Sequence, residues 1–231
     1  MSRAVPVAVA GLVAGGGLLL SAFTSIPGVL LAGALSVAGG MAAVVACSEL
    51  GFVLAGYVFS QTDDFRGVSL SWRAPDRRGW AFVIAGTVTA VALNRVAFSL
   101  GALAGIDPVA TVSTPEGLTA TGLLVVSPVF LLVVGPAEEY LFRGVLQGYL
   151  GQSFSVAGAI GWAAVLFTLV HVPNLLAAPE AAPVSLPVWL TLGVLLGWLY
   201  ERTGTVTVPA LVHGAYDVVV FTLLFMQWGL L

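Results

Sequence analysis

The chain has 231 residues, of which 59% are hydrophobic and 8% are charged. Soluble domains carry about a quarter charged residues, so this composition excludes a water-soluble globule, and the same hydrophobicity excludes a disordered chain. All eight basic residues are arginines, and with a net charge of −3 they form no basic face for nucleic acid. The single cysteine, Cys47, excludes an internal disulfide. The composition therefore predicts a polytopic membrane protein.

Apolar tracts long enough to cross about 30 Å of hydrocarbon recur along the chain. They are 4–23, 28–59, 80–104, 118–134 continuing to 150, 156–172, 187–200 and 206–230. Because these tracts are too long for membrane strands, we expect an all-α transmembrane helix bundle of about seven to eight helices. The tract 28–59 is expected to be one long or kinked helix. Its division, or a break at Pro136, would give eight helices.

The loop 61–79 is rich in arginine, and the positive-inside rule therefore places it in the cytoplasm. Its arginines are Arg66, Arg73, Arg77 and Arg78. The loops 105–117 and 173–185 contain acidic but no basic residues, which suits the opposite side. Two spans precede the arginine-rich loop, so the N-terminus is expected on the same side. The sequence thus predicts a multi-pass protein of the cell membrane with the N-terminus and loop 61–79 in the cytoplasm.

Ionisable residues inside the apolar tracts are candidates for function, because they are costly to bury in a bilayer. They are Glu49, Arg95, Glu138, Glu139, Arg143, His171, His213 and Asp217. Glu49 and Arg95 lie at similar predicted depths in their helices. Since a buried charge needs a partner, we expect these two residues to form a structural ion pair between two helices.

The segment 135–144 combines a proline with two carboxylates and an arginine. Pro136 and the carboxylates suit the first turn of a helix. Glu139 and Arg143 are four residues apart, so they share a helix face and can pair. Glu138 lies roughly 100° further round the helix and can point into a cavity. For this motif alone, an ordinary interfacial ion pair is the alternative interpretation.

Both histidines of the chain lie in apolar segments beside a second polar residue. His171 precedes Asn174 by three residues, and His213 shares a helix face with Asp217. Facing helices of a bundle commonly build sites in this way. With Glu138, this set is suited to water activation: the glutamate takes the proton, and the histidines orient the water or hold a metal and stabilise an oxyanion. No phosphate loop or zincin motif is present.

These residues resemble the three ordered motifs of the CPBP family, Glu-Glu-x-x-x-Arg, Phe-x-x-x-His and His-x-x-x-Asn/Asp. Here they are Glu138-Glu139 with Arg143, Phe167 with His171, and His213 with Asp217. The family includes the CAAX prenyl endopeptidases and the bacteriocin-processing or immunity-type membrane proteins (the Abi family). The resemblance covers about residues 127–220. It implies one integral membrane domain over residues 1–231, with variable N-terminal spans in 1–117 and a CPBP-like catalytic core in 118–231.

The resemblance implies an intramembrane endopeptidase that hydrolyses a peptide bond of a membrane-associated or lipidated substrate with glutamate-activated water. Glu138 resembles the general base, and Glu139 with Arg143 resembles its supporting pair. His171 and His213 resemble groups that position water or stabilise the oxyanion. The substrate is expected to enter from the cytoplasm or from the bilayer.

The last residue of the third motif departs from many relatives, because Asp217 lies where they have Asn. An ionised Asp cannot donate a hydrogen bond to an oxyanion, but it can hold His213 in one tautomer or ligate a metal. The family has been described both as metalloproteases and as metal-free glutamate proteases, so the metal is left open. A zinc site would need three of Glu138, His171, His213 and Asp217.

Two other functions stay open on the sequence. A non-catalytic membrane interaction or immunity protein would keep the polar cluster for folding or partner binding. A small proton-coupled transporter would use buried Glu and His as a proton relay, although no inverted repeat is recognisable.

The predicted depths of the site residues in the membrane do not agree. His171 is expected about 22 Å from the cytoplasmic end of its helix, deeper than Glu138 and His213, so a shared cavity requires a tilted or later-starting helix.

Overall fold

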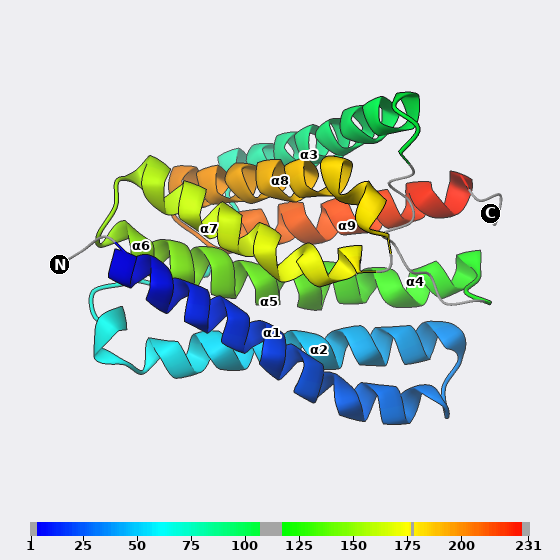
Figure 1. Ribbon diagram of the computed structural model, residues 1–231, viewed down its shortest axis with the longest axis horizontal. Helices are drawn as coiled ribbons and strands as arrows, with labels where there is room; N and C mark the ends of the chain where they lie inside the picture. The colour runs from blue at the N-terminus through cyan, green and yellow to red at the C-terminus, as the bar shows by residue number, and fades with distance from the viewer. Residues whose placement is uncertain (1–3, 107–116, 177, 228–231) are drawn as a thin grey trace.

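The computed structural model describes residues 4–106, 117–176 and 178–227, and every regular element in these ranges is helical. Seven helical stretches run along the long axis of the bundle (Figure 1). Six are α1 (Ala4–Ala32), α2 (Val37–Ser60), α3 (Arg77–Leu103), α7 (Val156–His171), α8 (Ala182–Thr203) and α9 (Thr207–Gln227). Short 3-10 turns lie at η1 (Asp63–Phe65), η5 (Val172–Leu175) and η6 (Pro179–Ala181).

The seventh stretch is a continuous helix over Ala120–Gly151, which we call the central helix. It consists of α4 (Ala120–Val129), η3 (Phe130–Val134), α5 (Gly135–Glu139), η4 (Tyr140–Gln147) and α6 (Gly148–Gly151). Both η3 and η4 are π-helical, a geometry that is frequent at functional sites. Pro136 lies in the first turn of α5 and does not divide the helix.

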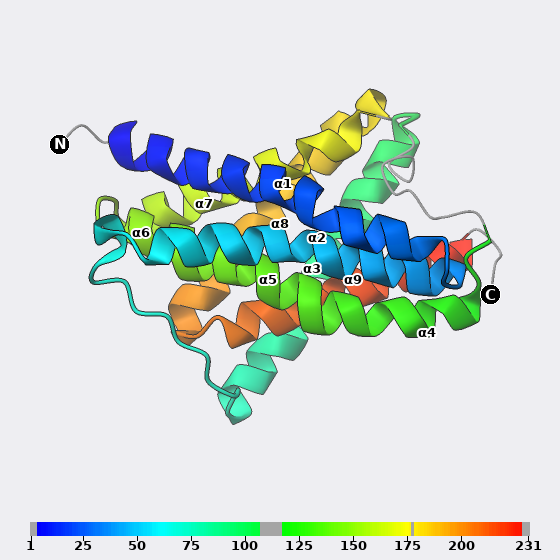
Figure 2. The same ribbon diagram turned by 90° about the horizontal axis from the view of Figure 1, so that it is seen from below.

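Six of the described helical stretches are long and apolar enough to cross a membrane, and the apolar part of α9, Thr207–Leu223, is shorter. The prediction of an all-α, multi-pass membrane bundle is therefore confirmed. The α1–α2 hairpin packs on one side of the central helix, and α3, α8 and α9 lie on the other (Figures 1 and 2). The start of α1 and the connection from α2 to α3 lie at the same end of the bundle.

The predicted single helix over 28–59 is wrong, because the chain turns between α1 and α2. The hydroxyl of Ser36 accepts a hydrogen bond from the Gly39 amide at 3.2 Å and caps α2. The turn is not recognisable from hydropathy, because a single capping serine changes the mean hydropathy of an apolar tract no more than a serine inside a helix does. The two helices then pack closely: a Cβ on Gly28 would lie 2.7 Å from Val44 Cα.

The predicted ion pair between Glu49 and Arg95 is also wrong. Within the described ranges, no ion pair joins these two residues. Their helices are on different sides of the bundle, because α2 packs on α1 and the central helix whereas α3 packs on α8 and α9. Glu49 is buried and instead lines a small apolar pocket with Pro136, Ala137 and Tyr140.

Candidate active site

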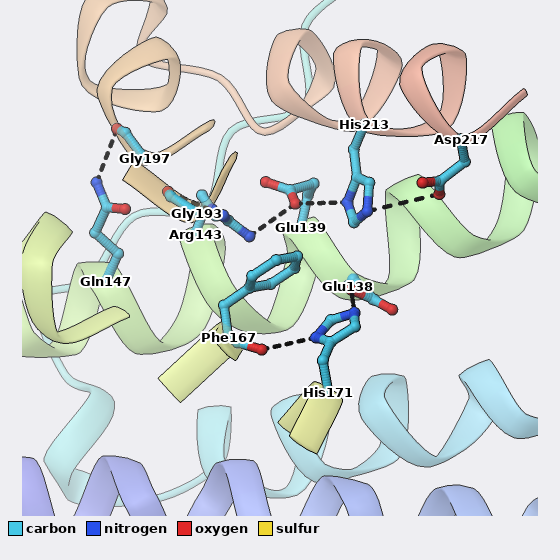
Figure 3. A network of polar contacts seen from close by, with 10 residues as sticks. All are labelled: Glu138, Glu139, Arg143, Gln147, Phe167, His171, Gly193, Gly197, His213 and Asp217. Carbon is cyan, nitrogen blue, oxygen red and sulfur yellow. Dashed lines mark hydrogen bonds and ion pairs between the residues drawn. The ribbon is translucent and has the colours of Figure 1, made fainter. Parts of the chain in front are cut away.

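The central helix carries a buried ion pair at the middle of the bundle. Glu139 and Arg143 are both fully buried, and Arg143 Nη1 donates to Glu139 Oε1 at 2.7 Å. Nη2 of the same guanidinium donates to the Gly193 carbonyl of α8 at 3.1 Å (Figure 3). The predicted pairing of Glu139 with Arg143 is confirmed. A buried charge is stable only when it is paired and hydrogen-bonded, and here the two opposite charges are in direct contact.

His213 of α9 joins the same carboxylate. Its Nδ1 lies 2.9 Å from Glu139 Oε1 (Figure 3). A carboxylate paired with arginine only accepts hydrogen bonds, so Nδ1 carries the proton and donates it to Glu139. The other ring nitrogen, Nε2, then points toward Asp217 Oδ2 at 3.6 Å. Glu139 therefore fixes both the orientation and the tautomer of this histidine.

Two glycines allow α9 to approach the central helix closely enough for this contact. A Cβ on Gly214 would lie 2.6 Å from the Leu131 Cα, and a Cβ on Gly135 would lie 2.9 Å from the Gly214 amide nitrogen. Small residues at such crossings let helix backbones approach in membranes. The neighbouring His213 is thereby brought within hydrogen-bond distance of Glu139.

His171 is held at the end of α7 by its own helix. Its Nδ1 lies 2.7 Å from the Phe167 carbonyl oxygen, four residues earlier. Since a carbonyl only accepts, Nδ1 donates this hydrogen bond and Nε2 is left facing Glu138. The Phe167 ring is buried and contacts His171, with 4.6 Å between ring centroids, and His213, with 5.6 Å. It also lies 4.7 Å from the Arg143 guanidinium carbon. The phenylalanine is thus a spacer that contacts all three polar groups.

Glu138 points away from the ion pair, as the sequence predicts. Its Oε2 lies 3.9 Å from His171 Nε2, which is too far for a direct hydrogen bond. Among the described residues this buried oxygen has no hydrogen-bond partner. Glu138, His171, His213 and Asp217 all line one cavity of about 620 Å³. The two carboxylates of the first motif therefore have separate environments: Glu139 is paired with Arg143, whereas Glu138 faces the cavity.

Although the sequence predicts that His171 lies deeper in the membrane than His213, both histidines line the same cavity. His171 is the last residue of α7, whereas His213 lies early in α9. However, α9 begins further into the bundle than α7 does (Figure 1). The connection before α9 is tied to the α2–α3 connection, because the Val206 amide donates to the Ser71 carbonyl at 2.9 Å. The two histidines consequently reach the same level.

Several residues at the cavity were not predicted. Asn94 of α3 is buried and lines the cavity, and its Nδ2 donates to Tyr216 Oη at 3.0 Å. Ser185 of α8 lines it as well, with a buried hydroxyl. Gln147 lies behind the ion pair and donates to the Gly197 carbonyl at 3.1 Å. The signal for each was an uncharged polar residue in an apolar tract, which a search restricted to ionisable groups omits.

The zinc interpretation does not fit this arrangement. Both histidines direct Nδ1 to a protein acceptor, as metal-ligating histidines do. Yet within the described ranges no three His, Cys, Asp or Glu side chains come together as a metal-binding group. Among these four residues two pairs come close: Glu138 with His171 at 3.9 Å, and His213 with Asp217 at 3.6 Å.

Comparison with known proteins agrees with the motifs. No curated protein and no solved structure matches the chain. The model of one family, described as type II CAAX prenyl endopeptidase Rce1-like, matches residues 119–219. This stretch holds the central helix, α7, α8 and the part of α9 that carries His213 and Asp217. The match confirms the resemblance seen in the three motifs: residues 119–219 of this chain are similar to the Rce1-like family.

Proposed function

We propose that this protein is an intramembrane endopeptidase of the CAAX kind, in which Glu138 activates water for hydrolysis of a peptide bond. One observation carries the proposal: a buried carboxylate oxygen of Glu138, unpaired among the described side chains, faces His171 Nε2 across 3.9 Å of a cavity. An intramembrane carboxylate that faces open space is a functional candidate by default. The family match supports the protease class.

In the proposed reaction Glu138 is the general base. It takes one proton from a water in the cavity while the water oxygen attacks the carbonyl carbon of the scissile bond. The resulting tetrahedral intermediate carries a negative oxygen. Glu138 then gives the proton to the departing amine nitrogen as the C–N bond breaks. Water is consumed, and the products are one carboxylic acid and one amine, which become carboxylate and ammonium when the acid gives its proton to the amine.

The histidines are the proposed partners of the developing oxyanion. Both Nδ1 protons are used on protein acceptors, one on Phe167 and one on Glu139, so both Nε2 atoms are available to the cavity. An Nε2 donates to an oxyanion only when its ring is the imidazolium. Carboxylates lie beside both rings: Glu138 is 3.9 Å from His171 Nε2, and Asp217 is 3.6 Å from His213 Nε2. The arrangement supports electrostatic stabilisation by pre-oriented donors.

The rest of the cavity supports an apolar substrate. Its walls include Phe98, Trp189, Leu192 and Phe221, between which the polar groups form a small patch. Cavities with apolar walls and few convergent polar groups are typical of binding sites. We therefore propose a membrane-associated or lipidated peptide as the substrate, with the bilayer as its route of delivery.

The position of the cavity suggests the side of entry. Its lining includes Met41 near the start of α2, Phe98 near the end of α3 and Leu176 after α7, which is 83% exposed. These segments lie at the end of the bundle opposite the start of α1 (Figure 1). With loop 61–79 in the cytoplasm, as the arginines predict, the substrate would enter from the outer side or laterally, not from the cytoplasm.

Cleavage of membrane-anchored and lipidated peptides by the purified protein tests the function. We expect Glu138→Gln to abolish cleavage and His171→Ala to lower it by roughly 10²-fold or more, because a general base and an oxyanion donor are lost. The matched control is Glu180→Gln, an exposed glutamate outside the cavity, which should leave cleavage unchanged. Cleavage by Glu138→Gln at the wild-type rate would overturn the proposal and favour a non-catalytic membrane protein.

The side of entry has its own test. Asn174 is exposed and lines the cavity, so Asn174→Cys in a Cys47→Ser background gives one thiol at the mouth. A membrane-impermeant maleimide added to intact cells should label it. Arg66→Cys in the same background should be labelled only after the membrane is opened. The reverse pattern would place the mouth in the cytoplasm.

A further inference from the structure

A second pocket lies at the opposite end of the bundle from the mouth of the cavity. It has a volume of about 290 Å³ and is formed by the end of the α2–α3 connection, the first turns of α3, the end of α8 and the start of α9. Three of the eight arginines of the chain line it, Arg73, Arg78 and Arg202. They come from three different elements, so only the folded bundle brings them together.

Each of these guanidinium groups is held in place without a carboxylate. Arg73 Nη2 donates to the carbonyl oxygens of residues 203 and 204, both at 3.2 Å. Arg78 lies over the Phe82 ring, 5.6 Å from its centroid, and Arg202 lies over the Trp198 ring, 5.3 Å from its centroid. These contacts orient the arginines and leave their charges uncompensated.

The two aromatic rings join the two cation–π pairs into one array. The Phe82 and Trp198 rings meet edge to face with 5.9 Å between centroids. Arg78, Phe82, Trp198 and Arg202 therefore form a continuous row across α3 and α8. The row has an arginine at each end, and both arginines line the same pocket.

The acidic groups nearby are already engaged. In the described part of the chain, no carboxylate lies within 4.0 Å of the guanidinium of Arg73, Arg78 or Arg202. Asp76 also lines the pocket, but its Oδ1 accepts from the Gly79 amide at 2.7 Å as the cap of α3. Glu201 accepts from Gln147 at 2.8 Å. The pocket thus carries an excess of positive charge and arginines suited to bind a phosphate group.

The surroundings of the pocket match the level of lipid headgroups. Trp80 is 51% exposed and Trp198 is 39% exposed, and tryptophans in such positions mark the membrane–water interface. Further along both helices, exposed aliphatic side chains recur at helical spacing. They are Ile84 and Val88 on α3 and Val194 and Leu190 on α8. An amphipathic ligand bound here would have its polar end at the arginines and its apolar part against the exposed faces of α3 and α8.

We propose that this pocket, lined by Arg73, Arg78 and Arg202, binds the phosphate headgroup of an anionic phospholipid whose acyl chains lie against α3 and α8. Basic pockets between transmembrane helices on the cytoplasmic side are the usual places for such headgroups. This lipid would fix the α3–α8–α9 side of the bundle relative to the membrane surface. The proposal does not depend on the protein being a peptidase.

Native mass spectrometry of delipidated protein tests the site. The protein is offered equal amounts of phosphatidylglycerol and phosphatidylcholine, and the ratio of the two bound lipids is measured. For Arg78→Gln/Arg202→Gln we expect the preference for phosphatidylglycerol to fall by about tenfold, since two phosphate-facing charges are removed. The control Arg66→Gln/Arg77→Gln removes the same charge from positions outside the pocket and should keep the preference.

Two further measurements, thermal unfolding and competition by inorganic phosphate, complete the test. Thermal unfolding of both double variants should match the wild type, because the substituted side chains are on the surface. An equal loss of preference in both double variants would reduce the effect to overall charge and overturn the proposal. Inorganic phosphate is the competitor that separates the two sources of the anion. Displacement of phosphatidylglycerol by phosphate alone would assign the pocket to a soluble anion and overturn the lipid proposal.

Discussion

Glu139 and His213 are 74 residues apart in the chain, and Glu139 Oε1 lies 2.9 Å from His213 Nδ1. The same oxygen accepts from Arg143 at 2.7 Å, so one carboxylate connects two of the three motifs. The second motif, Phe167 with His171, meets them through the Phe167 ring, which contacts both His213 and Arg143. The supporting pair therefore organises the site without facing the cavity itself.

The buried pair predicts a large asymmetry between single and double variants. Arg143→Met leaves Glu139 charged and buried, and we expect a loss of about 3–5 kcal/mol in the free energy of unfolding. Arg143→Met/Glu139→Gln leaves no net buried charge and should recover much of this loss. Thermal unfolding in detergent measures both. A single variant as stable as the wild type would contradict an ionised Glu139.

The close approach of α9 to the central helix predicts that Gly214 tolerates no side chain. Gly214→Ala puts a Cβ against the Leu131 backbone, so the helices separate and His213 moves away from Glu139. We expect loss of cleavage together with a lower unfolding midpoint. Gly161→Ala is the matched control, because its added Cβ meets open space within α7. It should raise stability by about 0.5–1 kcal/mol and leave cleavage unchanged.

The contact between Asp217 and His213 predicts different effects for two substitutions. Asp217→Ala removes the group 3.6 Å from His213 Nε2, and we expect cleavage to fall by about 10²-fold. Asp217→Asn keeps the side-chain shape and adds a donor for the oxyanion, so it should stay within about tenfold of the wild type. Initial rates on one peptide compare them. Equal damage by both substitutions would mean that only the negative charge matters.

The hydrogen bond between Asn94 and Tyr216 predicts coupling between α3 and α9. Asn94→Leu leaves the buried Tyr216 hydroxyl without its donor, which should cost about 1–3 kcal/mol. Tyr216→Phe should cost less, and the double variant should cost less than the sum of the two single variants. A double-mutant cycle on unfolding midpoints measures this coupling. Strict additivity would indicate that the bond contributes nothing.

The local parts of the site were predictable because helical spacing is short-range and regular. The pairing of Glu139 with Arg143 and the opposite direction of Glu138 both follow from 3.6 residues per turn. Contacts between helices were not predictable in the same way. Depth alone suggested Glu49 and Arg95 as partners, but depth does not determine which helices are neighbours. Asn94 was missed because an uncharged amide in an apolar tract gives a weaker signal than a charge.

The supporting pair also affects how the chain can enter the membrane. Each charged side chain at the centre of a bilayer costs about 2.5–3.5 kcal/mol during insertion. Because Glu139 and Arg143 are four residues apart on one helix, they can neutralise each other within a single segment as it leaves the translocon. Their compensation does not wait for His213, which is synthesised 74 residues after Glu139. The polar centre of the site can thus be assembled in two stages, an ion pair at insertion and a histidine when the bundle closes.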